Sequence, residues 1–189
     1  MIPARPGAGG SKFPFTDVGR NDDCYDAVKY LYENEIMNGT SDTLFSPNAE
    51  LTRGMVVTIL YRMEGEPFTL GSKSFSDVKA GRYYSEAVEW AAENGIVNGF
   101  TDGTFKPDQA VTREQLASIL RRYASFSGIA TYDAELPANA SVSNWAKKDV
   151  AWAYAEGILT SAQMVAAAKN ANRAEVAMAI YAYLTGTAR

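Results

Sequence analysis

One short motif recurs three times in this chain at a constant spacing. Its clearest copy is Val111-Thr112-Arg113-Glu114, and the arginine of that copy has counterparts at Arg53 and Arg173, each 60 residues from the next. Self-similarity at a fixed period is the signature of one supersecondary unit that is used repeatedly. The spacing therefore predicts several small units that share a core, rather than one continuous arrangement.

An ungapped alignment of residues 15–62 with residues 75–122 extends the similarity well beyond the motif. Eighteen of the 48 aligned positions are identical. They include an aromatic, an aspartate and a glycine ahead of the motif, at Phe15/Phe75, Asp17/Asp77 and Gly39/Gly99. Identity spread over the whole segment indicates an internal duplication.

We divide the chain into three repeats on this basis. The first is expected at residues 13–67, the second at 68–127 and a degraded third at 128–189. Residues 1–12 contain several glycines and prolines and lack the apolar segment of a signal peptide, so a linker or a cloning remnant is expected there. Any export signal of the natural protein is expected to lie outside this chain.

Each repeat is predicted to consist of a helix, a loop and a second helix, which makes the fold all-α. In the second repeat an apolar stripe ends at Asn94-Gly95, where glycine can adopt the left-handed conformation that ends a helix. A loop follows, and Thr112 with Gln115 three residues later forms a capping box for the next helix. The first repeat predicts helices over about Asp22–Asn34 and Arg53–Met63.

The third repeat keeps the helix starts but not the loop. Asn172 and Glu175 preserve the cap of its second helix, whereas the Asp-Gly turn, the phenylalanine and the proline of the other loops are missing. The alanine-rich residues 160–169 replace that loop and are predicted to be helical.

The composition argues against several classes of function. A net charge of −4 and a pI near 5.0 disfavour a nucleic-acid partner, which requires a basic surface. No apolar run approaches the roughly 20 residues of a membrane-spanning helix, so no membrane insertion is expected. The chain has no histidine and a single cysteine, which leaves an enzyme without its usual general base and predicts neither a metal nor a cofactor.

An arginine directly after a helix N-cap needs an explanation, because the first turn already carries the positive end of the helix dipole. One interpretation is an anion site in which the guanidinium and free backbone N–H groups hold a carboxylate. The other is structural: each arginine bonds loop carbonyls or pairs with Asp17 or Asp77 and so braces the repeat. The residues alone favour the structural interpretation.

Aromatic side chains provide flat faces on which a sugar ring can pack. Trp90 and Trp152 lie within the apolar stripes and are predicted to be buried. Tyr83 and Trp145 lie at the expected helix starts and are better candidates for the wall of a groove.

The combined motifs of the second repeat resemble the S-layer homology repeat of bacterial cell-surface proteins. The match is good in the first repeat and partial in the third. The residues that carry it in the second repeat are Phe75-x-Asp77-Val78, Asn94-Gly95-Ile96-x-x-Gly99, Asp102-Gly103-Thr104-Phe105-x-Pro107 and Val111-Thr112-Arg113-Glu114.

The resemblance implies three helix-loop-helix repeats in a pseudo-threefold bundle with grooves between neighbouring repeats. It implies a secreted, non-enzymatic module at the cell wall or surface of a Gram-positive-type bacterium. Such modules bind secondary cell-wall polysaccharide, often through a pyruvyl ketal on a terminal N-acetylmannosamine. Because that ketal carries a carboxylate, the resemblance shifts the preference for the arginines towards the anion site.

The resemblance also assigns ligand-binding roles to specific positions. The expected ligand-binding residues are Arg53, Arg113, Arg173, Asp17, Asp77, Tyr83, Trp145 and Gly99. If a groove combines the arginine of one repeat with the start of the next, then Arg53 is expected beside Asp77 and Tyr83, and Arg113 beside Trp145.

The third groove of this scheme is expected to be impaired. It would combine Arg173 with Asp17 and with Asp23, which stands where the groove aromatic belongs. The degraded third repeat leaves open an alternative function, a protein-interaction or surface-layer assembly module that has lost carbohydrate binding and self-associates. A small enzyme is a further alternative, disfavoured by the lack of histidine.

Overall fold

The computed structural model describes residues 13–186, and within them the chain forms helices and no extended strand. The predicted all-α fold is therefore confirmed, while the linker expected at residues 1–12 lies outside the described part. The helices are α1 (Tyr25–Glu33), α2 (Arg53–Met63), α3 (Ser85–Glu93), α4 (Arg113–Phe126), the short 3-10 helix η1 (Asn144–Ala146), α5 (Lys147–Ala155), α6 (Ser161–Met164) and α7 (Arg173–Thr185). None of these described helices is long and apolar enough to cross a membrane.

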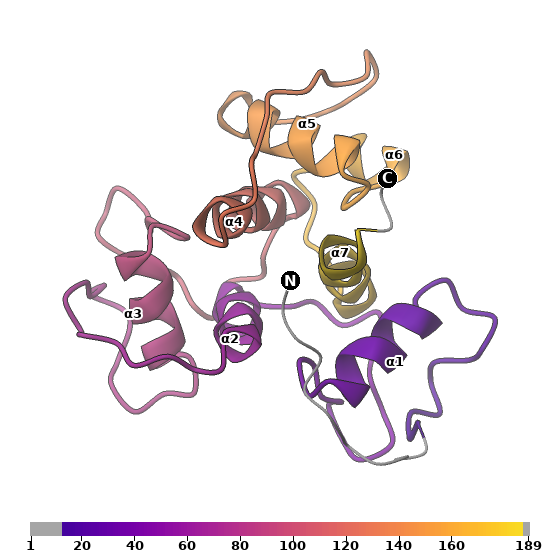
Figure 1. Ribbon diagram of the computed structural model, residues 1–189, viewed down its shortest axis with the longest axis horizontal. Coiled ribbons are helices and arrows are strands. Elements are labelled where there is room, and N and C mark those ends of the chain that lie inside the picture. The colour runs from indigo at the N-terminus through magenta and orange to yellow at the C-terminus, as the bar shows by residue number, and fades with distance from the viewer. Residues whose placement is uncertain (1–12, 187–189) are drawn as a thin grey trace.

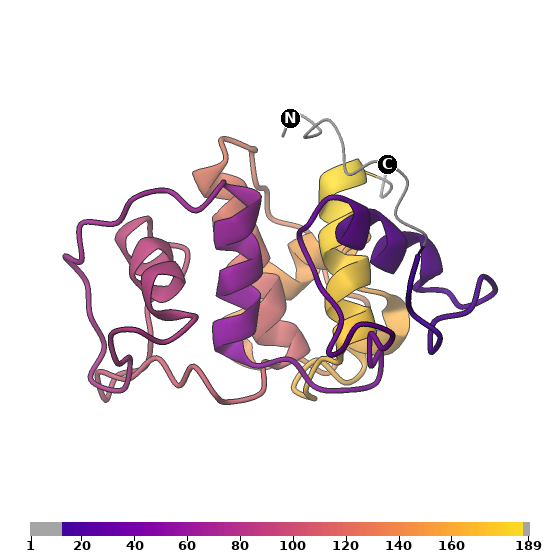
Figure 2. The same cartoon turned by 90° about the horizontal axis from the view of Figure 1, so that it is seen from below.

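The second helices of the three repeats form the centre of the molecule. In Figure 1, α2, α4 and α7 are seen nearly end-on around a common axis, with α1, α3 and α5 placed outside them. Figure 2 shows α2 and α7 upright, with α1 lying crosswise beside α7 and α3 seen nearly end-on beside α2. The principal contacts pair α2 with α3, α4 with α5, and α7 with α1. Each central helix thus packs on the outer helix of the following repeat, as the groove scheme predicted.

A ring of backbone hydrogen bonds ties the three central helices together just before they begin. The N–H of Leu51 donates to the carbonyl of Ala171 (3.3 Å), that of Ala171 to Val111 (2.8 Å), and that of Val111 to Leu51 (2.9 Å). All three residues are fully buried. Because the bonds close on themselves, every repeat depends on both of the others.

The helix caps agree with the sequence prediction, whereas two boundaries do not. Thr112 with Gln115 and Asn172 with Glu175 both form complete capping boxes. The first helix begins at Tyr25 instead of Asp22, because the preceding residues form turns. In the third repeat only Ser161–Met164 of the alanine-rich segment is an α-helix, so the longer helix predicted over residues 160–169 is wrong.

Candidate functional site

The N–H groups at the start of each central helix are occupied by the protein itself. The N–H of Arg53 donates to the Gln109 carbonyl at 2.9 Å, and the N–H of Gly54 donates to the Pro107 carbonyl at 2.8 Å. The equivalent donors in α4 bond the carbonyls of Lys169 and Ala167, and those in α7 bond the carbonyls of Ala49 and Pro47. Loops of the neighbouring repeat therefore take the first two donors of every central helix.

The third donor of each helix is taken by its own cap. The side chains of Thr52, Thr112 and Asn172 accept hydrogen bonds from the backbone N–H three residues later. The expectation that free backbone N–H groups contribute to an anion site is consequently wrong, because neighbouring carbonyls and the caps satisfy the donors that a helix start normally leaves open. The first three N–H groups of each central helix are therefore not free to bind an anion.

Arg53 and Asp77 both form hydrogen bonds with the backbone of Phe105. The carboxylate of Asp77 accepts hydrogen bonds from the N–H groups of Phe105 (2.8 Å) and Lys106 (2.7 Å). Arg53 donates from Nε to the Phe105 carbonyl at 2.9 Å, and its guanidinium lies over the Phe105 and Phe100 rings. Lys106 has φ of 58°, so Asp77 stabilises a left-handed residue that is not glycine.

The same arrangement recurs between the third repeat and the first. Asp17 accepts hydrogen bonds from the N–H groups of Phe45 (2.9 Å) and Ser46 (2.7 Å). Arg173 donates from Nε to the Phe45 carbonyl at 2.7 Å and from Nη2 to the Asn38 carbonyl at 2.6 Å. The two aspartates of the sequence motif thus order the loops on which the arginines rest.

Arg113 has a different partner, because the third repeat lacks the corresponding loop. Its guanidinium forms a two-point salt bridge with Glu175, with Nη2–Oε1 at 2.6 Å and Nε–Oε2 at 3.2 Å. Nη1 donates to the Ala166 carbonyl at 3.1 Å. All three arginines therefore bond loop carbonyls, which confirms that part of the structural interpretation, and Arg113 adds a carboxylate partner.

Arg53 is the most deeply buried of the three arginines, and among the described residues it shares with Arg173 the lack of a carboxylate ion pair. It is 6% exposed, and within residues 13–186 no ion pair joins it to a carboxylate. Burial lowers its pKa to about 10, an effect that nearby Asp77 opposes and Arg122 reinforces. Burial also lowers the pKa of Arg173, and Asp17 opposes that shift.

Gly99 serves the packing of its loop. Its φ is 67°, and a Cβ atom there would overlap the Phe75 ring and lie 2.7 Å from the Thr104 carbonyl oxygen. Gly39 is confined in the same way by Phe15 and by two loop carbonyls. The structure places Gly99 in a closely packed loop, and its expected contact with a ligand stays a prediction.

Tyr83 and Trp145 are the exposed aromatics that the sequence singled out. Tyr83 is 56% exposed and Trp145 57% exposed, whereas Trp90 and Trp152 are buried as predicted. Tyr83 directly precedes Tyr84, whose ring lies against Gly54 at the start of α2. Ser143, two residues before Trp145, donates hydrogen bonds from its N–H and its hydroxyl to the carboxylate of Glu114, which is next to Arg113. The chain neighbours Tyr84 and Ser143 thus contact the starts of α2 and α4, while the expected grouping of Tyr83 with Arg53 and of Trp145 with Arg113 stays a prediction.

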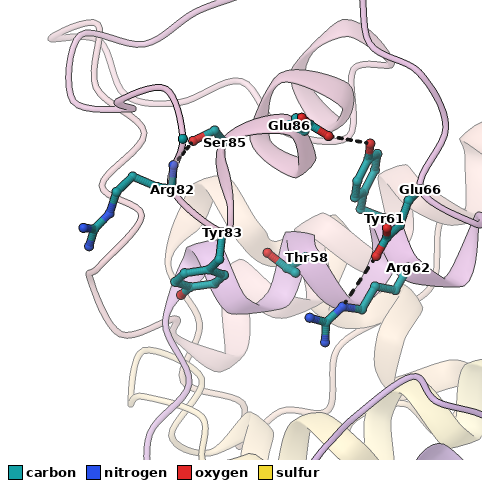
Figure 3. A pocket seen from close by; sticks show the side chains of 9 residues that line it. Thr58, Tyr61, Arg62, Glu66, Arg82, Tyr83, Ser85 and Glu86 are labelled. Atoms are coloured by element: carbon teal, nitrogen blue, oxygen red, sulfur yellow. Dashed lines mark hydrogen bonds and ion pairs between the residues drawn. The ribbon is translucent and has the colours of Figure 1, made fainter.

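A cavity of about 350 Å³ lies between α2 and the start of α3. In Figure 3 the ring of Tyr83 lies across α2 close to Thr58, while Arg62 and Glu66 stand at the other end of the groove. Arg62 pairs loosely with Glu66 (3.8 Å), and the Tyr61 hydroxyl donates to the Pro67 carbonyl (2.9 Å). The residues that line the cavity are Thr58, Tyr61, Arg62, Glu66, Gly81, Arg82, Tyr83, Ser85 and Glu86.

Of the sequence-predicted site residues, only Tyr83 lines this cavity. Thr58, Tyr61 and Arg62 were not predicted as site residues, although their spacing of three and four residues places them on one face of α2. Arg82 was not predicted either, because the motif position next to it is the aromatic Tyr83. A search for polar residues on the helix face that follows each motif arginine would have found the α2 members.

The fold defines a repeat module in which each central helix packs on the outer helix of the following repeat, and side chains of two adjoining repeats line the cavity between α2 and α3. The chain belongs to the S-layer homology family: the sequence model described as "S-layer homology domain" matches residues 14–54 and 74–117. The matched segments include the aspartates and arginines of the first two repeats. The third repeat lies outside the match and nevertheless supplies the outer and central helices that close the ring.

Several curated proteins are similar to this chain. An endoglucanase from Bacillus sp. (strain KSM-635) is 38% identical over 110 residues, 58% of this chain and 12% of that protein. An amylopullulanase from Thermoanaerobacterium thermosulfurigenes is 32% identical over 168 residues, 84% of this chain and 9% of that protein. A cellulosome-anchoring protein from Acetivibrio thermocellus is 25% identical over 141 residues, 70% of this chain and 30% of that protein. The chain therefore spans less than a third of each.

Proposed function

We propose that this chain is a non-enzymatic anchoring module that holds a protein at the bacterial cell surface. It binds an anionic secondary cell-wall polysaccharide without a covalent bond, and the charged group is the carboxylate of a pyruvyl ketal on a terminal sugar. The principal binding place is the groove between α2 and α3, where Tyr83 lines the cavity and Arg53, at the start of α2 beyond the cavity lining, supplies the positive charge.

Arg53 is the observation that carries this proposal. A guanidinium in a mostly apolar place is stabilised by an anion that can reach it, because burial penalises an unpaired charge. The protein supplies one carbonyl acceptor and two ring faces, which leaves terminal N–H groups for a ligand. A planar carboxylate suits those donors.

The relatives support an anchoring role in a second way. Two of them are named as enzymes that act on polysaccharides and one as a cellulosome-anchoring protein, while the similarity covers only a small part of each. A segment shared by proteins of such different names is more simply explained by a common attachment function than by a common reaction. The missing histidine agrees with a module that performs no catalysis.

Retention on purified cell-wall sacculi tests the proposal. The chain is expected to sediment with untreated sacculi and to remain in solution once the pyruvylated polymer has been extracted. Tyr83→Ala, which removes an exposed ring, should lower retention, whereas Phe126→Ala removes a less exposed aromatic outside the groove and is the matched control. Equal retention on both kinds of sacculi would overturn the proposal.

A role in protein interaction is the second candidate, and one surface feature favours it. Phe68 and Leu70 are 88% and 81% exposed on the segment that joins the first two repeats. Neighbouring apolar side chains so open to solvent are typical of contact surfaces. Phe68→Ser with Leu70→Ser should abolish self-association in analytical ultracentrifugation if that function holds, and should leave retention on sacculi unchanged if the anchoring function holds.

A further inference from the structure

The cavity between α2 and the start of α3 carries no net charge of its own. Arg62 and Arg82 line it together with Glu66 and Glu86, so its positive and negative side chains balance. A cleft that attracts an anion is lined by an excess of positive groups, because charges of one sign focus the field. The cavity therefore suits an uncharged polar group better than the carboxylate end of a polymer.

The hydroxyl groups of the cavity are committed as donors and remain available as acceptors. Thr58, Tyr61 and Ser85 each donate a hydrogen bond to a backbone carbonyl, at distances between 2.6 and 2.9 Å. A hydroxyl oxygen that donates in this way can still accept a hydrogen bond, whereas the guanidinium of Arg62 supplies donors only. Sugar hydroxyls both donate and accept, so they match this mixture of groups.

Arg62 and Glu66 form one end of the cavity and are loosely paired. Nε of Arg62 lies 3.8 Å from Oε1 of Glu66, and the two side chains are 39% and 61% exposed. Because an exposed ion pair contributes only about 0–1 kcal/mol, ligand hydroxyls can readily take its place. In Figure 3 the Tyr83 ring lies at the other end of the groove, with Thr58 between it and Arg62.

The motif arginine and this end of the cavity lie far apart along α2. Arg53 is the first residue of the helix, and Arg62 follows nine residues later. A rise of 1.5 Å per residue separates their backbone positions by about 13.5 Å along the helix axis. Since one sugar ring is shorter than this span, a ligand that contacts both arginines must extend over at least two sugars.

The pair of Arg62 and Glu66 is specific to the first of the three grooves. The 60-residue correspondence places Phe126 at the position of Glu66 in the second repeat and Gly186 in the third. Neither residue has a side chain that accepts a hydrogen bond from a sugar hydroxyl. Recognition through this pair is therefore confined to the groove between α2 and α3.

We infer that the cavity between α2 and α3 is a subsite for an uncharged sugar, next in the polymer to the charged terminal sugar that binds at Arg53. Arg62 and Glu66 bind its hydroxyl groups, and Tyr83 packs against its ring. The module thus recognises at least two consecutive sugars in this groove. The inference rests on the proposed function for the identity of the polymer.

Arg62→Ala tests the subsite, and Lys29→Ala is the matched control. Lys29 forms the same kind of pair with the residue four positions later on α1, its side chain is 41% exposed, and it does not line the cavity. Both substitutions therefore remove an exposed cation from a helical ion pair. Circular dichroism and thermal unfolding of the full chain confirm that both variants fold.

Calorimetric titration compares the wall polymer released from sacculi with the methyl glycoside of pyruvylated N-acetylmannosamine, which offers the terminal sugar alone. Arg62→Ala should weaken binding of the polymer at least about tenfold and leave the affinity for the glycoside within about twofold, because only the polymer reaches the subsite. Lys29→Ala should change neither affinity. An equal loss with both ligands would assign Arg62 to the terminal sugar and overturn the inference, as would unchanged binding of the polymer.

A second readout separates this inference from the proposed function. The Nε–H resonance of Arg62 is followed by NMR during addition of the methyl glycoside of N-acetylmannosamine, which carries no charge. The resonance should shift in the wild type and shift less in Tyr83→Ala. A shift in a protein that binds no wall polymer would refute the proposed function and uphold the subsite. An unchanged Arg62 resonance in a protein that binds the polymer would refute the subsite and leave the proposed function intact.

Discussion

The Phe75 ring lies so close to Gly99 that there is no room for a methyl group on that glycine. A Cβ atom on Gly99 would overlap the Phe75 ring and approach the Thr104 carbonyl oxygen to 2.7 Å. The ring lies against Phe105, the buried residue that Asp77 and Arg53 hold. The glycine therefore allows the loop to close over the residue on which the groove arginine rests.

Gly99→Ala is expected to destabilise the chain by about 2–4 kcal/mol, from overpacking together with the left-handed backbone. Gly103→Ala is the matched control, because Gly103 has φ of 77° but nothing within 4 Å of its added methyl group. It should cost only the backbone part, about 1–2 kcal/mol. Urea unfolding followed by circular dichroism measures both, and equal losses would contradict the packing argument.

Arg53→Lys is expected to destabilise the chain although it preserves the charge. Lysine has no Nε–H to donate to the Phe105 carbonyl and no planar group to stack on the two rings. Loss of a buried hydrogen bond from a charged donor costs about 1.5–3 kcal/mol. Arg62→Lys, on the same helix but with a half-exposed side chain, should change the free energy of unfolding by less than about 0.5 kcal/mol.

Chemical denaturation of the two variants under the same conditions decides the point. A loss in Arg53→Lys no larger than in Arg62→Lys would show that Arg53 does not brace the loop. Because Arg53 is also proposed to hold the ligand, its variants should be compared at equal fractions of folded protein in any binding assay.

Sequence reasoning predicted the local features well, because helix caps, apolar stripes and left-handed glycines are encoded within a few residues. Thr112 and Gln115 are an example, since a capping box is complete within one turn. The pairing of each central helix with the following repeat also follows once the duplication is recognised. The short length of α6 was missed, because alanine content reports helix propensity but not where the neighbouring repeat demands a turn.

Contacts between repeats could not be predicted in the same way. Arg113 and Glu175 are 62 positions apart, and their contact depends on how α4 and α7 meet at the axis. The carbonyls of Gln109 and Pro107 that occupy the helix start of α2 come from a loop more than 50 residues later. The prediction of free N–H groups at the helix starts was wrong for that reason. An isolated helix has unbonded N–H groups at its start, whereas here carbonyls of the neighbouring repeat accept hydrogen bonds from them.

The chain is expected to fold as one cooperative unit. A fragment of residues 13–127 would leave α4 without α5 and α1 without α7, and would lack two of the three bonds of the ring, since both involve Ala171. We expect this fragment to lack a cooperative thermal transition, while the whole chain unfolds in a single step by circular dichroism and by tryptophan fluorescence.

A circular permutant is the control for this prediction. A chain that begins at residue 68 and joins residue 186 to residue 13 through a flexible linker keeps all three helix pairs in a new order, so it should unfold cooperatively. A fragment of two repeats with a sharp transition near that of the whole chain would show that the repeats are independent.

Because of Tyr123, we expect the free energy of unfolding to depend on pH in alkaline solution. Its ring is fully buried, and its hydroxyl donates to Glu64 at 2.6 Å. Burial, and then the hydrogen bond and the charge of Glu64, raise the pKa of Tyr123 above its ordinary value of 10.0. The unfolded chain therefore releases this proton near pH 10 while the folded chain keeps it.

Above pH 10 the unfolded chain binds fewer protons than the folded chain. The stabilisation that the raised pKa of Tyr123 gives to the folded chain is therefore fully present below pH 10. It is lost as the pH rises above 10, by up to about 1.4 kcal/mol per pH unit. The lowered pKa of Arg53 acts in the opposite direction over the same range, so the wild type alone cannot isolate the tyrosine. Tyr123→Phe should cost a constant amount, about 1 kcal/mol, between pH 6 and 8, and the difference should shrink from pH 10 upwards. Urea midpoints at pH 7, 9, 10 and 11 measure this; a difference that stays constant to pH 11 would show that Tyr123 ionises as readily in the folded chain as in the unfolded one.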